Sequence, residues 1–196
     1  FTDDVPSITA DTGVDESGVT LTTADANTEG VASDTDTASF ASAFEAAAAA
    51  DGDYGADGAG TLTVGSYALS LASGVSNGDA SGLESSGNAV LLRENGDDIE
   101  GYYGTTVVFS LSVDDATGVV TLTQNEALDH DDAGTGTGTD LSLVLADDLV
   151  SLSGVATITD SEGDTDTATY SVDLSGVSFT DDVPSITADT GVDESG

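Results

Sequence analysis

The sequence predicts an all-β protein, an antiparallel β-sandwich built from short strands. Apolar and β-branched residues recur in short runs, several with the period of two that suits a half-buried strand. Turns rich in Gly, Asp and Asn separate these runs. Helical patterns do not alternate with the strands, as they would in a protein with a parallel α/β sheet. These three observations favour a sandwich, but they do not give the order of its strands.

The expected strands are distributed along the whole chain. Pro6 opens an extended run at 7–10, and residues 19–22 (Val-Thr-Leu-Thr) alternate apolar and polar side chains. Residues 114–118 (Asp-Asp-Ala-Thr-Gly) have a turn composition, which predicts a hairpin of the two strands beside them. The remaining strands are expected at 61–64, 67–71, 89–92, 102–113, 119–123, 141–145, 155–159 and 167–177.

One segment predicts a short helix near residues 37–50. It contains a run of five alanines, and Asp36 or Thr37 could serve as the N-cap. Phe40 and Phe44 are four residues apart, so a helix places both rings on one face. We expect this helix to pack on one end of the sandwich with the two rings buried.

The charge of the chain excludes several functions. There are 38 acidic residues against one base, Arg93, so the net charge is -37. Nucleic acids and anionic lipid surfaces are excluded as partners because both require clustered Lys and Arg. Cys is absent and His130 is the single histidine, which excludes disulfides and thiolate metal sites. The longest uncharged stretch, 58–78, is too polar for a membrane span, and any export signal is expected outside this sequence.

The composition is nevertheless that of a folded domain. Hydrophobic residues make up 38% of the chain, which is more than disordered acidic chains contain. Two like charges about 6 Å apart cost roughly 3 kcal/mol at an effective dielectric constant near 20. Because the chain supplies almost no cations, we expect ions from solvent to offset this repulsion.

The sequence also contains a repeat. Residues 1–18 and 179–196 are identical. This identity predicts a parent protein in which the unit recurs head to tail. Residues 1–178 are then one complete repeat, and residues 179–196 are the start of the next, comprising a linker and a first strand.

Acidic residues cluster in turns, and one turn is the strongest candidate for a calcium site. Asp160, Glu162, Asp164 and Asp166 alternate around Gly163 directly after an apolar strand. Calcium requires six to eight oxygen ligands, which closely spaced acids in a Gly-containing loop can supply. The alternative is a solvated acidic hairpin turn.

Two further clusters are weaker candidates. Asp53 and Asp57 lie in a Gly-rich segment, 51–58, that either wraps a calcium ion or is a plain loop. Asp129, His130, Asp131 and Asp132, with Asp140 beyond them, form the weakest cluster, in which we expect His130 to be a solvated loop residue and not a ligand. The acids at 97–100 and 147–148 are interpreted as turns.

The junction between repeats carries acids of its own. Asp3 and Asp4 are followed by Asp15 and Glu16, and Asp181 and Asp182 repeat the first pair. An elongated domain with an immunoglobulin-like strand order has its chain ends at opposite poles. The last hairpin turn, 160–166, then faces Asp3 and Asp4. We therefore expect calcium to bridge this turn to the incoming linker and stiffen the joint.

Three segments together resemble the long tandem extender repeats of bacterial RTX adhesins. They are residues 53–60 (Asp-Tyr-Gly-Ala-Asp-Gly-Ala-Gly), the turn at 160–168 and the junction at 179–186 (Phe-Thr-Asp-Asp-Val-Pro-Ser-Ile). The resemblance implies a calcium-binding β-sandwich in a giant protein of the bacterial cell surface, exported by type I secretion. Such a protein projects terminal adhesive domains for biofilm formation. Two departures from the family pattern are Glu162 in the last turn and Val183 before Pro184.

The interpretation that follows is a non-catalytic, monomeric spacer, bound to calcium and to neighbouring identical repeats but to no small-molecule substrate. One alternative is an adhesive module that binds carbohydrate through calcium, with Tyr54, Tyr102 and Tyr103 as stacking platforms. A glycosidase with paired acids and a salt-adapted surface without specific ions are further alternatives. Arg93 is expected to pair with a neighbouring acid.

Overall fold

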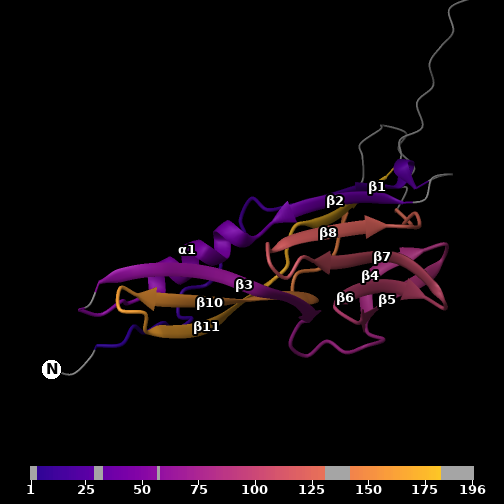
Figure 1. Ribbon diagram of the computed structural model, residues 1–196. Coiled ribbons are helices and arrows are strands. Elements are labelled where there is room, and N and C mark those ends of the chain that lie inside the picture. Colours follow the sequence, from indigo (N-terminus) through magenta and orange to yellow (C-terminus); the bar gives the residue numbers. More distant parts are fainter. Residues whose placement is uncertain (1–3, 29–32, 57, 131–141, 182–196) are drawn as a thin grey trace, which may run out of the picture.

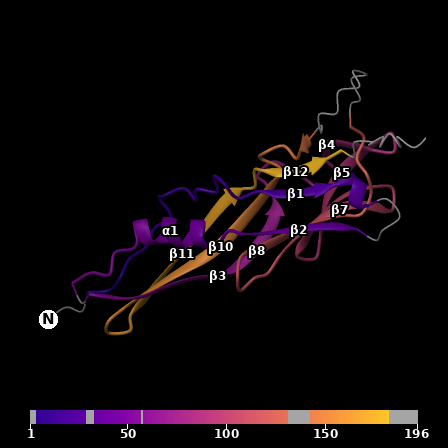
Figure 2. The ribbon, with the colours of Figure 1, turned by 90° about the horizontal axis from the view of Figure 1, so that it is seen from above.

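The computed structural model describes residues 4–28, 33–56, 58–130 and 142–181, and these residues form an elongated body (Figures 1 and 2). Strands dominate it, so the all-β prediction is confirmed. The strands form three sheets rather than the two of a simple sandwich. The chain enters beside α1 and the β10–β11 turn, and β12 ends at the opposite end of the body.

Six strands form the largest sheet, which is antiparallel throughout and curls into a half-barrel. The predicted hairpin around residues 114–118 is confirmed, because β7 and β8 pair on either side of it. Gly101 allows the fully buried ring of Phe109 to lie across the neighbouring strand, since a Cβ at Gly101 would stand 2.1 Å from that ring. In sheet order the strands are β2 (Asp34–Ser39), β8 (Val119–Gln124), β7 (Thr106–Val113), β6 (Asp98–Tyr103), β5 (Asn88–Asn95) and β4 (Ala80–Ser85).

A second, three-stranded sheet carries the helix. Its strands are β11 (Thr165–Asp173), β10 (Val150–Asp160) and β3 (Ala59–Leu71), all antiparallel. Alternate residues of β10 are buried, as the period of two requires. The helix α1 (Ala41–Asp51) packs on β3 and β10, where Phe44 meets the Tyr67 ring edge to face at 5.4 Å.

The third sheet contains the first and last strands of the described chain. Its order is β1 (Leu21–Ala24), β12 (Val177–Thr180) and β9 (Ser142–Val144). The strands β1 and β12 run parallel, which departs from the antiparallel pairing that we expected. Phe179 of β12 lies 5.2 Å from Phe109 of β7, so this sheet packs on the six-stranded sheet. A short 3-10 turn, η1 (Asp25–Asn27), follows β1.

The predicted helix is correct in its centre and wrong at its start. Phe40 and Phe44 are buried, as expected, but the helix begins at Ala41 and has no side-chain N-cap. Residues 34–39 form β2 instead, paired with β8. The carboxylates of Asp34 and Asp36 accept hydrogen bonds from the N–H groups of Ala24 and Thr22, so β2 also satisfies the edge of β1.

Strand boundaries also differ from the predictions where glycines occur. The segments 61–64 and 67–71 are one strand, β3, which has a bulge where Ser66 and Tyr67 stand opposite the single residue Gly154 of β10. The segment 102–113 is divided between β6 and β7 by a turn at Gly104, and 167–177 is divided between β11 and β12. Of the extended run 7–10, only Ser7 pairs, in a bridge with Asp53.

The acidic turns and the repeat boundary also differ in part from the predictions. Asp147 and Asp148 lie in a turn, as predicted. Of the predicted turn at 97–100, only Asp97 lies in a turn, because β6 begins at Asp98. The expected boundary between residues 178 and 179 falls inside β12, which continues through Thr180. Residues 179 and 180 therefore pair with β1 and β9.

Candidate functional site

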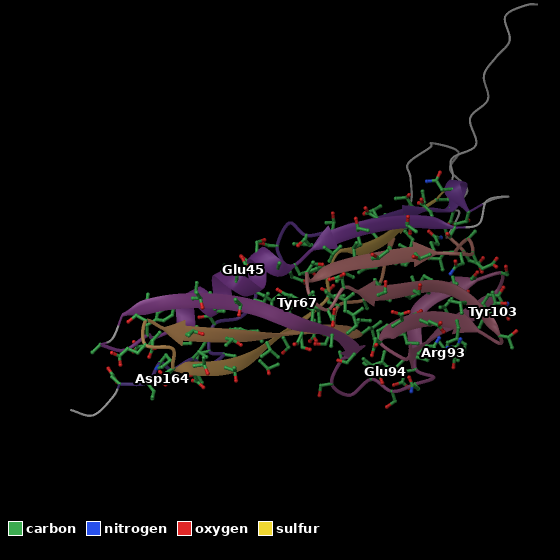
Figure 3. The ribbon with its side chains drawn as sticks, viewed as in Figure 1. Glu45, Tyr67, Arg93, Glu94, Tyr103 and Asp164 are labelled. Carbon is green, nitrogen blue, oxygen red and sulfur yellow. The ribbon has the colours of Figure 1, made fainter. Side chains whose placement is uncertain are left out.

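The turn between β10 and β11 is organised around the carboxylate of Asp160. This residue is only 4% exposed, and its Oδ1 accepts hydrogen bonds from the N–H groups of Glu162, Gly163 and Asp164 at 2.8–2.9 Å. Its Oδ2 is buried and has no hydrogen-bond partner within the described residues. Asp164 lies at this end of the molecule in Figure 3. The turn therefore holds one carboxylate oxygen ready for a ligand.

The N-terminal segment lies against the same end of the molecule. The N–H of Ile8 donates to Asp166 Oδ2 at 2.9 Å, and Ser7 and Asp53 exchange two backbone hydrogen bonds. The N–H groups of Ile8 and Thr167 hold the pKa of Asp166 below its ordinary value. The incoming chain and the last hairpin turn are thus neighbours, but Ile8 makes the contact and not Asp4.

Asp4 contacts the Gly-rich loop that follows α1. Its Oδ2 accepts a hydrogen bond from the N–H of Ala56 at 2.7 Å, and Asp53 Oδ1 accepts one from the N–H of Gly55. Gly55 has a φ of +69°, and a Cβ there would stand 2.8 Å from Asp4 Oδ2. Asp3 and Asp57 lie outside the described residues. Among those described, the carboxylates at this end do not bring three acidic ligand atoms within 4.8 Å of one another.

Asp15 and Glu16 lie apart from that turn and bond elsewhere. Asp15 Oδ1 accepts a hydrogen bond from the N–H of Ser17, and the bonds to Ser17 lower the pKa of Asp15. Glu16 Oε1 accepts one from the N–H of Ser175, which ties this segment to the connection between β11 and β12. The two acids therefore hold the chain segment in place and are not grouped with Asp160.

A second candidate site lies at the opposite end of the molecule, where β1 and β12 both end. One ligand atom each of Asp25, His130 and Asp181 lies within 4.8 Å of the other two. Asp25 begins η1, His130 lies in the segment that follows β8, and Asp181 follows β12. Asp25 and Asp181 are neighbours because the parallel strands β1 and β12 end side by side. His130 joins them because Leu128, two residues before it, is bonded to Asp25.

The side chain of His130 is buried, only 3% exposed, so the expectation of a solvated loop residue is wrong. Neither ring nitrogen has a hydrogen-bond partner among the described residues. The Nε2 atom stands 3.3 Å from Asp25 Oδ2, close enough for an ion pair but without hydrogen-bond geometry. The segment after β8 is bonded to Asp25 of η1 through the N–H of Leu128, a long-range contact that the local sequence does not indicate.

Asp25 is held by groups from the same segment. The amide Nε2 of Gln124 donates to its Oδ1, and the N–H of Leu128 donates to both carboxylate oxygens at 3.1 and 3.3 Å. Burial raises the pKa of Asp25, and the charge of Asp181 adds to that rise. Sequence reasoning missed Asp25 because it is a single acid after a strand and belongs to no cluster. Asp181 was predicted as a ligand from the junction, while Asp182, Asp131, Asp132 and Asp140 lie outside the described residues.

The single arginine takes no part in either site. Arg93 Nη2 lies 2.6 Å from Glu100 Oε2, which confirms the expected pairing with a neighbouring acid. Its guanidinium also lies 4.3 Å from the centre of the Tyr102 ring. Tyr54 and Tyr103 are partly buried against the core. The aromatic side chains considered as stacking platforms are thus engaged within the protein.

The described residues also contain a surface hollow, and their helices can be compared with the length of a membrane span. A hollow of about 400 Å³ lies between residues 12–19 and α1, lined by small and polar side chains with the carboxylate of Asp15. No helix among the described residues is both long and apolar enough to cross a membrane, and α1 has only 11 residues.

Comparison with known proteins identifies a family without an assigned function. A family model described as "Domain of unknown function (DUF5801)" matches residues 11–175, which is most of the chain. No curated protein matches the sequence, and no solved structure matches it either. The matched region runs from the segment before β1 to the end of β11 and so includes both α1 and the Asp160 turn. The chain belongs to the DUF5801 family.

Proposed function

We propose that this chain is a structural extender: one rigid, calcium-bound unit of a long bacterial surface adhesin, joined head to tail to identical units. Its role is mechanical, to hold terminal adhesive domains away from the cell, and it performs no catalysis. The observation that carries the proposal is the repeated segment. Residues 1–18 and 179–196 are identical, and the described parts of the two copies are bound at opposite ends of an elongated body.

The way the two copies are bound supports a stiff joint. Phe179 is fully buried, Thr180 Oγ1 donates to the carbonyl of Thr23, and Asp181 lies beside Asp25 and His130. The next residue corresponds to Asp4, by the identity of the two segments. Asp4 is bonded to Ala56 at the start of a unit. In a head-to-tail array, consecutive residues of the junction would therefore be held by consecutive units, with no free linker between them.

Two observations support bound calcium: the net negative charge of the chain and one buried carboxylate oxygen without a hydrogen bond. The chain carries a net charge of -37, so a bound cation would reduce the repulsion that opposes folding. Asp160 Oδ2, buried and without a hydrogen-bond partner, is the atom that best fits a calcium ligand. Asp4, Asp53 and Asp166 lie at the same end of the molecule and could contribute further oxygens.

The finer fold class also belongs to this proposal. We infer an immunoglobulin-like sandwich, extended at one end by β3, β10 and β11. Support comes from the packing of the β1–β12–β9 sheet on the six-stranded sheet through Phe179 and Phe109. The carbohydrate-binding alternative has less support, since Tyr102 lies under Arg93.

The test is a protein of two successive units, residues 1–178 followed by 1–196, studied with calcium and with a chelator. With calcium we expect small-angle scattering to give a narrow distribution of maximum dimensions near twice that of one unit. When the concentration of free calcium is one hundred times the Kd of a site, binding at that site adds about 2.7 kcal/mol to the free energy of unfolding. Calorimetry should therefore show a higher Tm with calcium, and magnesium at the same concentration should be weaker.

A variant and a matched control locate the effect. Asp160→Asn keeps the shape of the side chain but removes its charge, so it should lose most of the calcium-dependent rise in Tm. Asp173→Asn removes the same charge from an exposed position of β11 and should retain that rise. Scattering and Tm that a chelator leaves unchanged would contradict the proposal.

A further inference from the structure

The geometry points to a transition-metal site formed by Asp25, His130 and Asp181, which binds a divalent ion of the zinc class. These side chains offer one imidazole nitrogen and two carboxylate oxygens, all within 4.8 Å of one another. Ligand atoms that surround one zinc ion at about 2.0–2.2 Å lie roughly 3.4 Å apart. Small side-chain shifts therefore suffice for the three atoms to reach a common ion.

The buried imidazole is the second, independent observation. The side chain of His130 is only 3% exposed, and in the part of the chain that the structure describes neither of its nitrogens has a hydrogen-bond partner. A buried polar group without a partner is costly, and native proteins almost always pair it. Its Nε2 faces the carboxylate of Asp25. A bound metal ion would give this ring the partner that the protein does not.

The surroundings of Asp25 resemble the outer shell of a metal ligand. Gln124 and the N–H of Leu128 hold the carboxylate from one side, which fixes its orientation toward His130. Asp181 brings a second negative charge to the same place. Arg93, the only Lys or Arg in the chain, is paired with Glu100 and cannot neutralise these two acids. A divalent cation would cancel their charge.

The ligand set selects the class of metal. Calcium takes oxygen ligands in numbers of six to eight, and an imidazole nitrogen is not among them. Imidazole with carboxylates suits zinc and its first-row neighbours. The site is therefore distinct from the calcium position proposed at Asp160, and it does not depend on that proposal. Its effect would be to fasten η1, the segment after β8 and the end of β12 to one another.

The test uses the one histidine of the 196-residue chain as its own reporter. In millimolar calcium, which occupies the general acidic sites, zinc is titrated while the ring nitrogen signals of His130 are followed by NMR. We expect the signals to shift to a new, saturated position at one equivalent of zinc. Cobalt in place of zinc should give visible ligand-field absorption. Unchanged imidazole signals at one equivalent would overturn the inference, and the same shift produced by calcium alone would overturn the class of metal.

Variants separate this site from weak binding to other acids. His130→Gln should lower zinc affinity, measured by calorimetric titration, by at least about tenfold, because loss of even an outer-shell partner of a metal ligand costs about 10–100-fold. Asp147→Asn removes a charge from an exposed turn and should leave the affinity unchanged. If His130→Gln does not fold, Asp181→Asn provides the same comparison. Equal affinity in the folded variant and in wild type would overturn the site. A failure of calcium to stiffen the two-unit protein would leave these outcomes unaffected.

Discussion

At the scale of single residues, carboxylates in this protein serve as hydrogen-bond acceptors for the backbone. Asp51 is the clearest case. It accepts bonds from the N–H of Asp11, from the N–H and hydroxyl of Thr12, and from the hydroxyl of Tyr170 at 3.0 Å. One acid at the end of α1 therefore anchors the N-terminal segment. Burial, with the bond to Asp51, raises the pKa of Tyr170 to about 12.

Asp51 predicts a particular dependence of stability on pH. The bonds from Thr12 hold the pKa of Asp51 below its ordinary value near 3.9. A carboxyl whose pKa is lower in the folded state stabilises the fold above its unfolded pKa, and that contribution disappears as pH falls through the folded pKa. The Tm difference between wild type and Asp51→Asn should therefore be constant above about pH 5 and shrink below about pH 4.

Comparison of the two proteins removes the general effect of protonating the other acids, which both share. Thermal unfolding followed by circular dichroism between pH 2 and pH 7 measures the difference directly. A difference that grew as the pH fell would show that the charged form of Asp51 does not stabilise the fold.

At the scale of elements, α1 is held by its aromatic side chains and not by its caps. Its N-cap, Phe40, makes no side-chain cap bond, so tertiary packing must supply most of its stability. Phe44 is fully buried against Tyr67. A Cβ at Gly154 of β10 would stand 2.9 Å from Tyr67 and 3.1 Å from Phe44. The helix thus lies close to the sheet because β10 has a glycine there.

Removing the Phe44 ring should release the helix from the sheet. Phe44→Ala is expected to lower the free energy of unfolding by about 3–5 kcal/mol, the usual cost of a large cavity in a core. Glu45→Ala, one position along on the exposed face, should change it by less than about 0.5 kcal/mol. Urea unfolding monitored by tyrosine fluorescence gives both values. Equal midpoints for the two variants would mean that α1 is not docked through Phe44.

At the scale of the whole molecule, electrostatic repulsion is the dominant opposing force that the sequence reveals. With a net charge of -37, the chain should respond to salt even when no divalent ion is present. Raising ionic strength from about 0.01 M to about 1 M shortens the Debye length from about 30 Å to about 3 Å. We expect the Tm in a chelator to rise over this range, with sodium and choline chloride giving similar curves, because screening does not depend on the identity of the cation. A flat or falling Tm would exclude net repulsion as a limit on stability.

Local patterns were sufficient for much of the secondary structure. Turn residues at 114–118 and around Gly163 lie between strands that do pair as hairpins, because such turns depend on a few neighbouring residues. The period of two identified most strands, and the spacing of Phe40 and Phe44 identified the buried face of the helix. The all-β class and the tendency of acids to lie in turns follow from the sequence by itself.

Only the tertiary structure decided which strands are neighbours and which polar groups are buried. The strand β2 is polar, Asp-Thr-Asp-Thr-Ala-Ser, and exists because β8 pairs with it and β1 uses its carboxylates. Likewise, Asp25 and Asp181 meet because β1 and β12 run parallel and end together, and His130 reaches them because Leu128 is bonded to Asp25. Such contacts join residues far apart in the chain, and their free energy comes from packing and pairing partners that no local window of sequence contains.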